Sequence, residues 1–98
     1  MAIYSKEHKT VQGNVFAVCD KDIAGKTLKE GAMELFVSEK FYKEKEISEK
    51  ELRKKLKTFD NINLVGNNAV KIAVEEKIVD EKSVLCIQGV AHAQIFRI

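Results

Sequence analysis

The chain has 98 residues, of which 45% are hydrophobic and 33% are charged, and this composition is typical of one folded domain with a single core. The formal net charge of +2 excludes binding of nucleic acid or anionic membranes through overall charge, so any basic patch must be local. No signal-like segment opens the chain, and no apolar run approaches the ~20 residues of a membrane span. We therefore expect one cytoplasmic domain over residues 1–98, with no membrane partner.

The two cysteines, Cys19 and Cys86, lie far apart, and each stands in an apolar run. A small disulfide-stapled domain has more cysteines, and zinc sites use closely spaced pairs. Unpaired cysteine usually packs as a small hydrophobic residue. The sequence therefore predicts two buried free thiols in a reducing compartment, with no metal site and no cofactor.

The N-terminal half predicts strands that are joined by tight turns. Residues 2–9 alternate as an outer strand does, and Gly13 suits the hairpin turn that follows. Residues 15–19 are apolar on both faces, which predicts a central strand. Asp20 is then expected to cap a short helical turn, and residues 33–38 alternate again as a third strand.

The clearest local signal is a helix that begins after Ser48. Ser48 and Glu51 have the spacing of a capping box, in which the serine side chain accepts a hydrogen bond from the backbone of the glutamate. An apolar stripe at helical spacing follows in Leu52, Leu56 and Phe59. These residues predict an amphipathic helix with one buried side.

The C-terminal half predicts a second helix and a hairpin. Residues 60–66 alternate but form too short a segment to assign, and Asn67 or Asn68 is expected to cap the next helix. Residues 83–87 and 91–98 read as two strands around a turn. The order of strands and helices predicts an α+β domain, with a mostly antiparallel sheet and two α-helices packed on one face.

Four segments, at 18–26, 37–42, 63–73 and 89–95, carry a family resemblance. Through them the chain resembles an archaeal family of small proteins known as domain of unknown function 424. The resemblance covers essentially the whole chain and implies a cytoplasmic archaeal protein, with no established activity to transfer. The last segment of the family reads more like G-V-P-H-A-Q, so Ala91 departs from the pattern.

The terminal strand raises the first functional hypothesis. Alternation places His92 and Gln94 on one face together with Phe96 and Ile98. An imidazole and a carboxamide two residues apart suit recognition of an amide, a base edge or a phosphate, and the imidazole could also act as a general base. The alternative is a solvated edge strand whose polar side chains face water.

The segment that contains Asn63, Gly66, Asn67 and Asn68 leads into the predicted second helix. Free N–H groups and the helix dipole make a helix N-terminus attractive to anions, which predicts a phosphate-binding position. The segment lacks the motifs of a P-loop and of a dinucleotide-binding fold, and a plain helix cap explains the same residues.

A possible catalytic set consists of Cys19, Asp20, Lys26 and His92. The first three surround the turn after the predicted central strand, where sites are frequent, and a nucleophilic cysteine needs a histidine partner. The alternative is a buried cysteine followed by a capping aspartate. No two candidate ligands among the cysteines and His92 have chelate spacing, which argues against a metal.

The first predicted helix has a basic side formed by Lys50, Arg53, Lys54 and Lys57. Such a row suits contacts with nucleic-acid phosphates, although neighbouring glutamates dilute its charge and a solvated surface has the same pattern.

The leading hypothesis is a small binding module without a cofactor, which contacts RNA or a translation-related protein. Its basic helix would contact phosphates, while His92 and Gln94 would read a base or a peptide group. The second hypothesis is a small enzyme with the catalytic set above. The third is a structural subunit with an exposed apolar strand edge near Phe96 and Ile98.

Overall fold

Strands β2 (Gly13–Asp20) and β6 (Asn61–Val65) lie at the centre of the fold and pair in parallel. Phe16 to Cys19 of β2 have no exposed surface on either face, and in β6 Leu64 and Val65 are equally buried although they point to opposite faces. Asn61 and Asn63 of β6 are only half-buried. A parallel pair needs cover on both sides, which explains the apolar run from residue 15 to 19. The segment that was too short to assign from sequence is therefore a core strand.

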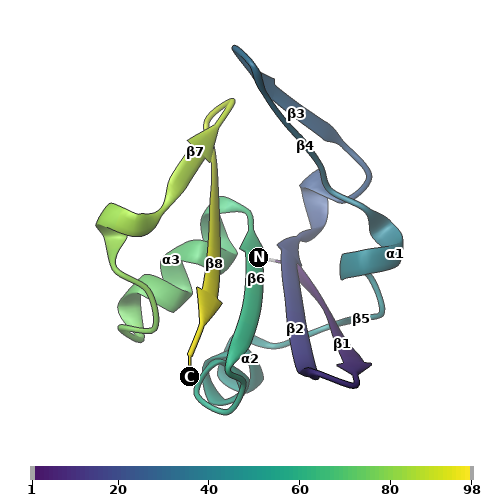
Figure 1. The fold of residues 1–98 in the computed structure, drawn as a ribbon, viewed down its shortest axis with the longest axis vertical. Coiled ribbons are helices and arrows are strands. Elements are labelled where there is room, and N and C mark those ends of the chain that lie inside the picture. Colours follow the sequence, from purple (N-terminus) through teal and green to yellow (C-terminus); the bar gives the residue numbers. More distant parts are fainter. Residues whose placement is uncertain (1, 98) are drawn as a thin grey trace.

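The computed structural model describes residues 2–97 (Figure 1). Its main sheet has six strands in the order β5-β1-β2-β6-β8-β7, and every pair except β2–β6 is antiparallel. The remaining strands of this sheet are β1 (Ile3–Thr10), β5 (Lys45–Glu46), β7 (Leu85–Ile87) and β8 (Val90–Phe96). A separate hairpin is formed by β3 (Thr27–Glu30) and β4 (Met33–Phe36). The α+β prediction is confirmed.

Two helices, α2 (Glu49–Leu56) and α3 (Asn67–Glu75), cover one face of the sheet, as predicted. Leu52 and Leu56 of α2 are fully buried and belong to the same core cluster as Phe16. The N-terminus of α2 is capped as expected, because the backbone N–H of Glu51 donates to Ser48 Oγ at 3.1 Å. Helix α2 ends at Leu56, and Phe59 beyond it stacks on Phe16 with ring centroids 4.8 Å apart.

The opposite face of the sheet has its own, smaller cover, which the sequence reasoning missed. Helix α1 (Glu39–Tyr42) packs over β1 and β2 on this side, and the β3–β4 hairpin contacts β7 beyond it. Tyr42 and Leu28 enter a second core cluster that contains Cys19 and Val65. Two short 3-10 turns, η1 (Lys21–Ile23) and η2 (Glu81–Ser83), complete the described elements.

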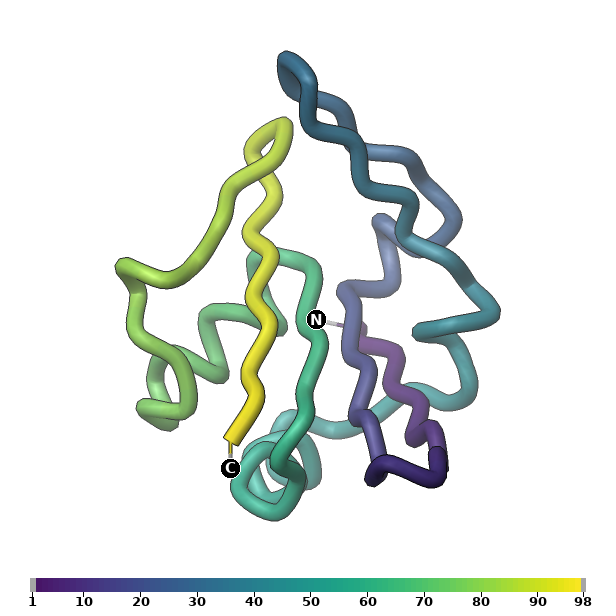
Figure 2. The backbone as a smooth tube through the Cα atoms, in the orientation of Figure 1, coloured from purple at the N-terminus to yellow at the C-terminus, as the bar shows by residue number. Residues whose placement is uncertain are grey.

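The backbone trace in Figure 2 separates two ends of the molecule. The β3–β4 and β7–β8 hairpins extend at one end, where Gln88 joins them: its side-chain oxygen accepts from Lys29 N at 3.0 Å, and its own N–H donates to Glu30 Oε1 at 2.7 Å. The β1–β2 turn, the α2–β6 loop and the end of β8 meet at the other end.

Candidate functional site

Five polar and aromatic side chains share one surface on β6 and β8, which we call the open face: Asn61, Asn63, His92, Gln94 and Phe96. The register places Asn61 opposite Phe96 and Asn63 opposite Gln94, and side chains of opposed residues point to the same side. Gln94 and Phe96 are exposed, and the other three are half-buried. The structure therefore brings together the predicted Asn63, His92 and Gln94, while Ile98 lies outside the described residues.

The open face is the part of the sheet that α1 and the β3–β4 hairpin leave uncovered. Their cover extends to Val65, which is fully buried, and to Asn63, which is reached by the Tyr42 hydroxyl. Beyond this line, the side chain of Phe96 is 73% exposed. Strand β8 is thus not an edge strand over its whole length, because β7 pairs with residues 90–92, but its last residues have no outer neighbour among the described strands.

Two internal hydrogen bonds orient the polar groups of the open face. The Tyr42 hydroxyl donates to Asn63 Oδ1 at 2.5 Å, and burial raises the pKa of Tyr42 so that this donor stays protonated. The occupied oxygen leaves the Asn63 N–H groups for a ligand. His92 Nδ1 lies 2.9 Å from the carbonyl oxygen of Leu64, which only accepts, so Nδ1 carries a proton and the neutral ring has Nε2 as a free acceptor.

The open face also lacks negative charge. Alternation along β1, β2, β6 and β8 directs the Asp and Glu side chains of these described strands, Glu7 and Asp20, to the helix-covered side. A ligand with anionic groups therefore meets no carboxylate from these strands on the open face.

The predicted anion position at the start of α3 is occupied by a carboxylate of the protein itself. Asp20 accepts hydrogen bonds from Asn68 N at 3.0 Å and Ala69 N at 2.9 Å. The helix begins at Asn67, so the asparagines do not cap it, and Asp20 caps α3 rather than the short turn that follows it in sequence. Burial raises the pKa of Asp20, and the two N–H donors oppose this shift.

Asn67 instead connects α3 to the β7–β8 hairpin. Its side-chain nitrogen donates to the Gly89 carbonyl at 3.1 Å, and its oxygen accepts from Ala91 N at 2.8 Å. A proline at position 91, as in the family pattern, would lack this N–H. The Asn67 carboxamide is therefore engaged in positioning the strand that carries His92.

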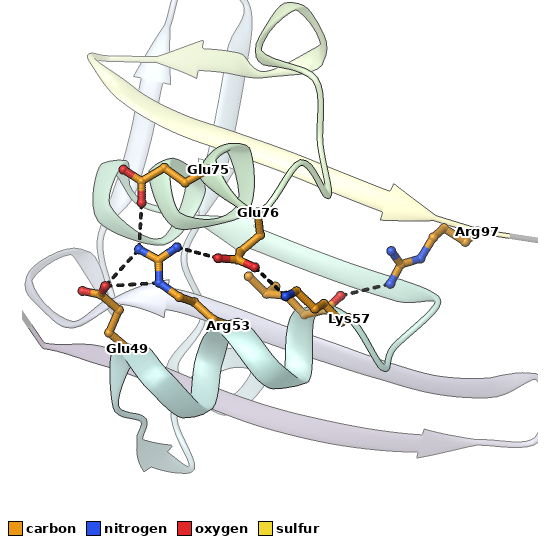
Figure 3. A network of polar contacts seen from close by, with 7 residues as sticks. Glu49, Arg53, Lys57, Glu75, Glu76 and Arg97 are labelled. Atoms are coloured by element: carbon orange, nitrogen blue, oxygen red, sulfur yellow. Dashed lines mark hydrogen bonds and ion pairs between the residues drawn. The ribbon is translucent and has the colours of Figure 1, made fainter.

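The basic side of α2 is partly neutralised by α3 (Figure 3). Arg53 donates to Glu49, Glu75 and Glu76 at 2.7–3.2 Å, and Lys57 lies 2.9 Å from Glu76. Lys57 and then Arg53 hold the pKa of Glu76 below its usual value. Arg53 thus connects the two helices. Lys50 and Lys54, in contrast, are exposed and make no ion pair within the described residues.

The four residues of the possible catalytic set do not share one pocket. Cys19 and His92 lie on the same face of the sheet, but both are opposed to Val65, which therefore stands between them on the intervening strand. Asp20 points to the other face, toward α3. Lys26 is exposed in the turn before β3, where its backbone bonds Ile23 and Val37.

The two cysteines differ in their environments, and only one of them is buried as predicted. Cys19 has no exposed surface, whereas Cys86 is exposed. Burial, with the nearby carboxylates of Asp20, Asp22 and Glu39, raises the pKa of Cys19 to about 12. A thiol that stays protonated is a poor nucleophile at neutral pH.

We therefore expect an alkylating reagent at mildly alkaline pH to modify Cys86 rapidly and Cys19 only after unfolding. Mass spectrometry of the native protein should show one modified thiol, and the same treatment in denaturant should show both. The Cys86→Ser variant is the control and should stay unmodified while folded. Rapid modification of Cys19 in that variant would contradict its burial.

A cavity of about 840 Å³ adjoins the open face at the end where the β1–β2 turn and the α2–β6 loop meet. It includes Asn61 and Phe96 of the open face, and also Asn14, Asp60 and Arg97. The sequence reasoning did not select Asn61, Asn14 or Asp60, because polar residues at turns are common and their convergence depends on strand pairing.

Residues 2–97 contain no group of three or more His, Cys, Asp or Glu side chains arranged to hold a metal ion. None of the described helices has the length and apolar character needed to cross a membrane.

The known family and the solved structure that the chain matches are both described as uncharacterised. A family model described as "Protein of unknown function (DUF424)" matches residues 8–98. Among solved structures, an uncharacterized conserved protein from Methanopyrus kandleri has a TM-score of 0.79 and 27% sequence identity, with 100% of this chain and 95% of that chain covered. No curated protein matches the chain.

Proposed function

The chain belongs to the DUF424 family of proteins of unknown function, and we propose that it is a cytoplasmic archaeal binding module that reads bases of single-stranded RNA on its open face. The observation that carries this proposal is the composition of that face. Hydrogen-bonding side chains without charge, at Asn61, Asn63 and Gln94, stand beside the exposed ring of Phe96. Unpaired bases are recognised by stacking on aromatic rings and by hydrogen bonds to their edges.

The arrangement of charge on the open face supports an anionic partner such as RNA. No carboxylate of β1, β2, β6 or β8 points to the open face, so the RNA backbone meets no repulsion from these strands. Lys50 and Lys54 of α2 are the exposed cations that we assign to phosphate contacts, while Arg53 and Lys57 would have to exchange their glutamate partners for phosphates. Helix α2 covers the face of the sheet opposite the open face, so an RNA strand that contacts both must pass around the end of the sheet where the α2–β6 loop lies. Lys57 directly precedes Thr58, which lines the cavity next to the open face.

We expect fluorescence anisotropy to detect binding of a short fluorescein-labelled single-stranded RNA of mixed sequence, with an affinity that falls steeply as salt is raised. Replacing Phe96 with Ala should weaken binding about tenfold, because stacking contributes ~1–3 kcal/mol per base. The matched control is Phe36→Ala, which removes another exposed ring from the separate β3–β4 hairpin. Lys54→Glu should also weaken binding, but equally for all sequences.

An RNA affinity that Phe96→Ala leaves unchanged would contradict the proposal, as would the absence of binding at low salt. His92→Ala provides a second test, because it removes the free Nε2 acceptor from the same face. The substitution also removes the hydrogen bond between His92 Nδ1 and the Leu64 carbonyl oxygen. The thermal unfolding of this variant must therefore be compared with that of the parent protein.

One observation favours a second candidate, binding of a protein partner by strand addition to β8. The N–H of Arg97 donates to Asp60 on the β6 side, so alternation directs the backbone N–H and C=O groups of Gln94 and Phe96 outward. Strand β7 pairs only with Val90–His92 and leaves these groups accessible to an extended peptide. A protein recovered from native lysate by the tagged chain, after both ribonuclease and high salt, would support this candidate against RNA.

A further inference from the structure

The cavity beside the open face has one aromatic wall and one aromatic side chain at its mouth. Phe96 lies opposite Asn61 across β6 and β8, in a pair without mutual backbone hydrogen bonds, because the backbone of Phe96 points away from β6. Side chains of such pairs approach closely, so the carboxamide of Asn61 stands beside the exposed ring. Phe59 lines the cavity and is held in place by stacking on the buried Phe16.

The polar groups of the cavity divide into those already bonded and those open to a ligand. Thr58 Oγ1 donates to Lys55, and the Arg97 guanidinium donates to the carbonyls of Leu56 and Phe59 at the end of α2. In contrast, the side chains of Asn14 and Asn61 have no hydrogen-bond partner within the described residues.

Asp60 is the one acid that lines this cavity among the described residues. Its side chain is 80% exposed, and its Oδ1 lies 4.0 Å from Arg97 Nε, too far for a hydrogen bond. The carboxylate therefore has acceptor capacity to spare, and the cavity also holds the carboxamide of Asn61, which can both donate and accept.

We propose that this cavity binds a guanine base, and this inference rests on the proposed RNA-binding function and specifies its base. Guanine has two neighbouring N–H donors, at N1 and at the exocyclic N2, and a carboxylate accepts such a pair with its two oxygens. Adenine and cytosine offer one donor beside an acceptor on the same edge, and uracil offers one donor between two acceptors. Asp60 thus selects guanine by charge-assisted pairing.

The remaining groups fit the rest of the base. The O6 and N7 atoms of guanine are acceptors, and Asn61, which lines the cavity from β6, has the N–H groups to donate to them. The ring of Phe96 provides the stacking surface at the mouth. The cavity volume of about 840 Å³ leaves room for the ribose to extend toward solvent.

The test is a titration of the ¹⁵N-labelled protein with GMP, IMP and AMP, followed by NMR chemical shifts of the backbone amides. IMP differs from GMP only by lacking the N2 amine. We expect GMP to bind about tenfold more tightly than IMP, with AMP weaker still, because a charge-assisted hydrogen bond contributes roughly 1.5–3 kcal/mol. Asp60→Asn should abolish the preference for GMP over IMP, and Asp22→Asn, an exposed acid elsewhere, should preserve it.

A parallel measurement uses the labelled RNA with each guanosine replaced by inosine, so that the free nucleotide and the RNA-borne base are compared. Loss of affinity on this replacement, absent in Asp60→Asn, would support the guanine site. Equal affinity for GMP and IMP, or an Asp60→Asn variant that retains the preference, would overturn it even if RNA still binds through Phe96. Selective GMP binding without any RNA binding would keep the guanine site and refute the RNA function.

Discussion

Replacing Gly66 with Ala is expected to lower the free energy of unfolding by about 3 kcal/mol, as the sum of backbone strain and a damaged helix cap. The φ angle of Gly66 is +121°, a conformation that residues with a Cβ rarely adopt. An added Cβ would also lie 2.4 Å from Asp20 Cγ and 2.6 Å from Oδ1. The carboxylate that caps α3 would therefore be displaced, and the N–H groups of Asn68 and Ala69 would lose their acceptor.

Gly13 offers a closely matched control for this substitution. Its φ of +123° is nearly the same, but a Cβ there would meet nothing within 4 Å, so Gly13→Ala should cost only the strain of about 1–3 kcal/mol. Urea denaturation followed by circular dichroism measures both variants. Equal losses would show that Asp20 moves aside without cost. Combining Gly66→Ala with Asp20→Ala should cost less than the sum of the single changes, since the second change removes the obstructing atoms.

Phe16→Ala is expected to lower the free energy of unfolding by about 3–5 kcal/mol, because it opens a cavity in a core that is otherwise filled. The side chain has no exposed surface and stacks on Phe59 at 4.8 Å. Since Phe59 lines the proposed guanine cavity, loss of its support should also weaken GMP binding in the fraction that remains folded.

The matched control is Phe36→Ala, the same truncation at a side chain that is 58% exposed on the β3–β4 hairpin. Its effect on stability should stay within about 0.5 kcal/mol, as for other surface substitutions. Thermal and urea unfolding of the two variants measure the contrast. A loss at Phe36 as large as at Phe16 would show that the exposed ring is covered in solution.

The residues of the open face show which side-chain directions the sequence pattern could predict. Alternation along the last strand placed His92, Gln94 and Phe96 on one side, and the structure agrees, because side-chain direction in a strand follows from backbone geometry alone. Asn63 was selected as part of a helix-start motif. It belongs to the same face for another reason, which is the pairing of β6 with β8.

The predicted phosphate-binding position at the start of α3 shows what residue patterns could not predict. Gly66, Asn67 and Asn68 stand at a helix start, as expected, but Asp20 supplies the anion from a strand 48 residues away in sequence from Asn68. The row of cations on α2 was visible in the sequence. Its neutralisation by Glu75 and Glu76 was not, because those residues belong to α3 and meet Arg53 only when the helices pack.

By itself, the sequence determined the features that depend on neighbours within a few residues: the cap of α2 by Ser48, the buried stripe of Leu52 and Leu56, the β1–β2 and β7–β8 hairpins and the α+β class. Tertiary structure alone decided the parallel pairing of β6 with β2, the separation of Cys19 from His92 by Val65, and the cavity that gathers Asn61 and Asp60. Local periodicity encodes which way a side chain points. Which segments become neighbours is decided by the burial of both sheet faces at once, and that depends on the whole chain.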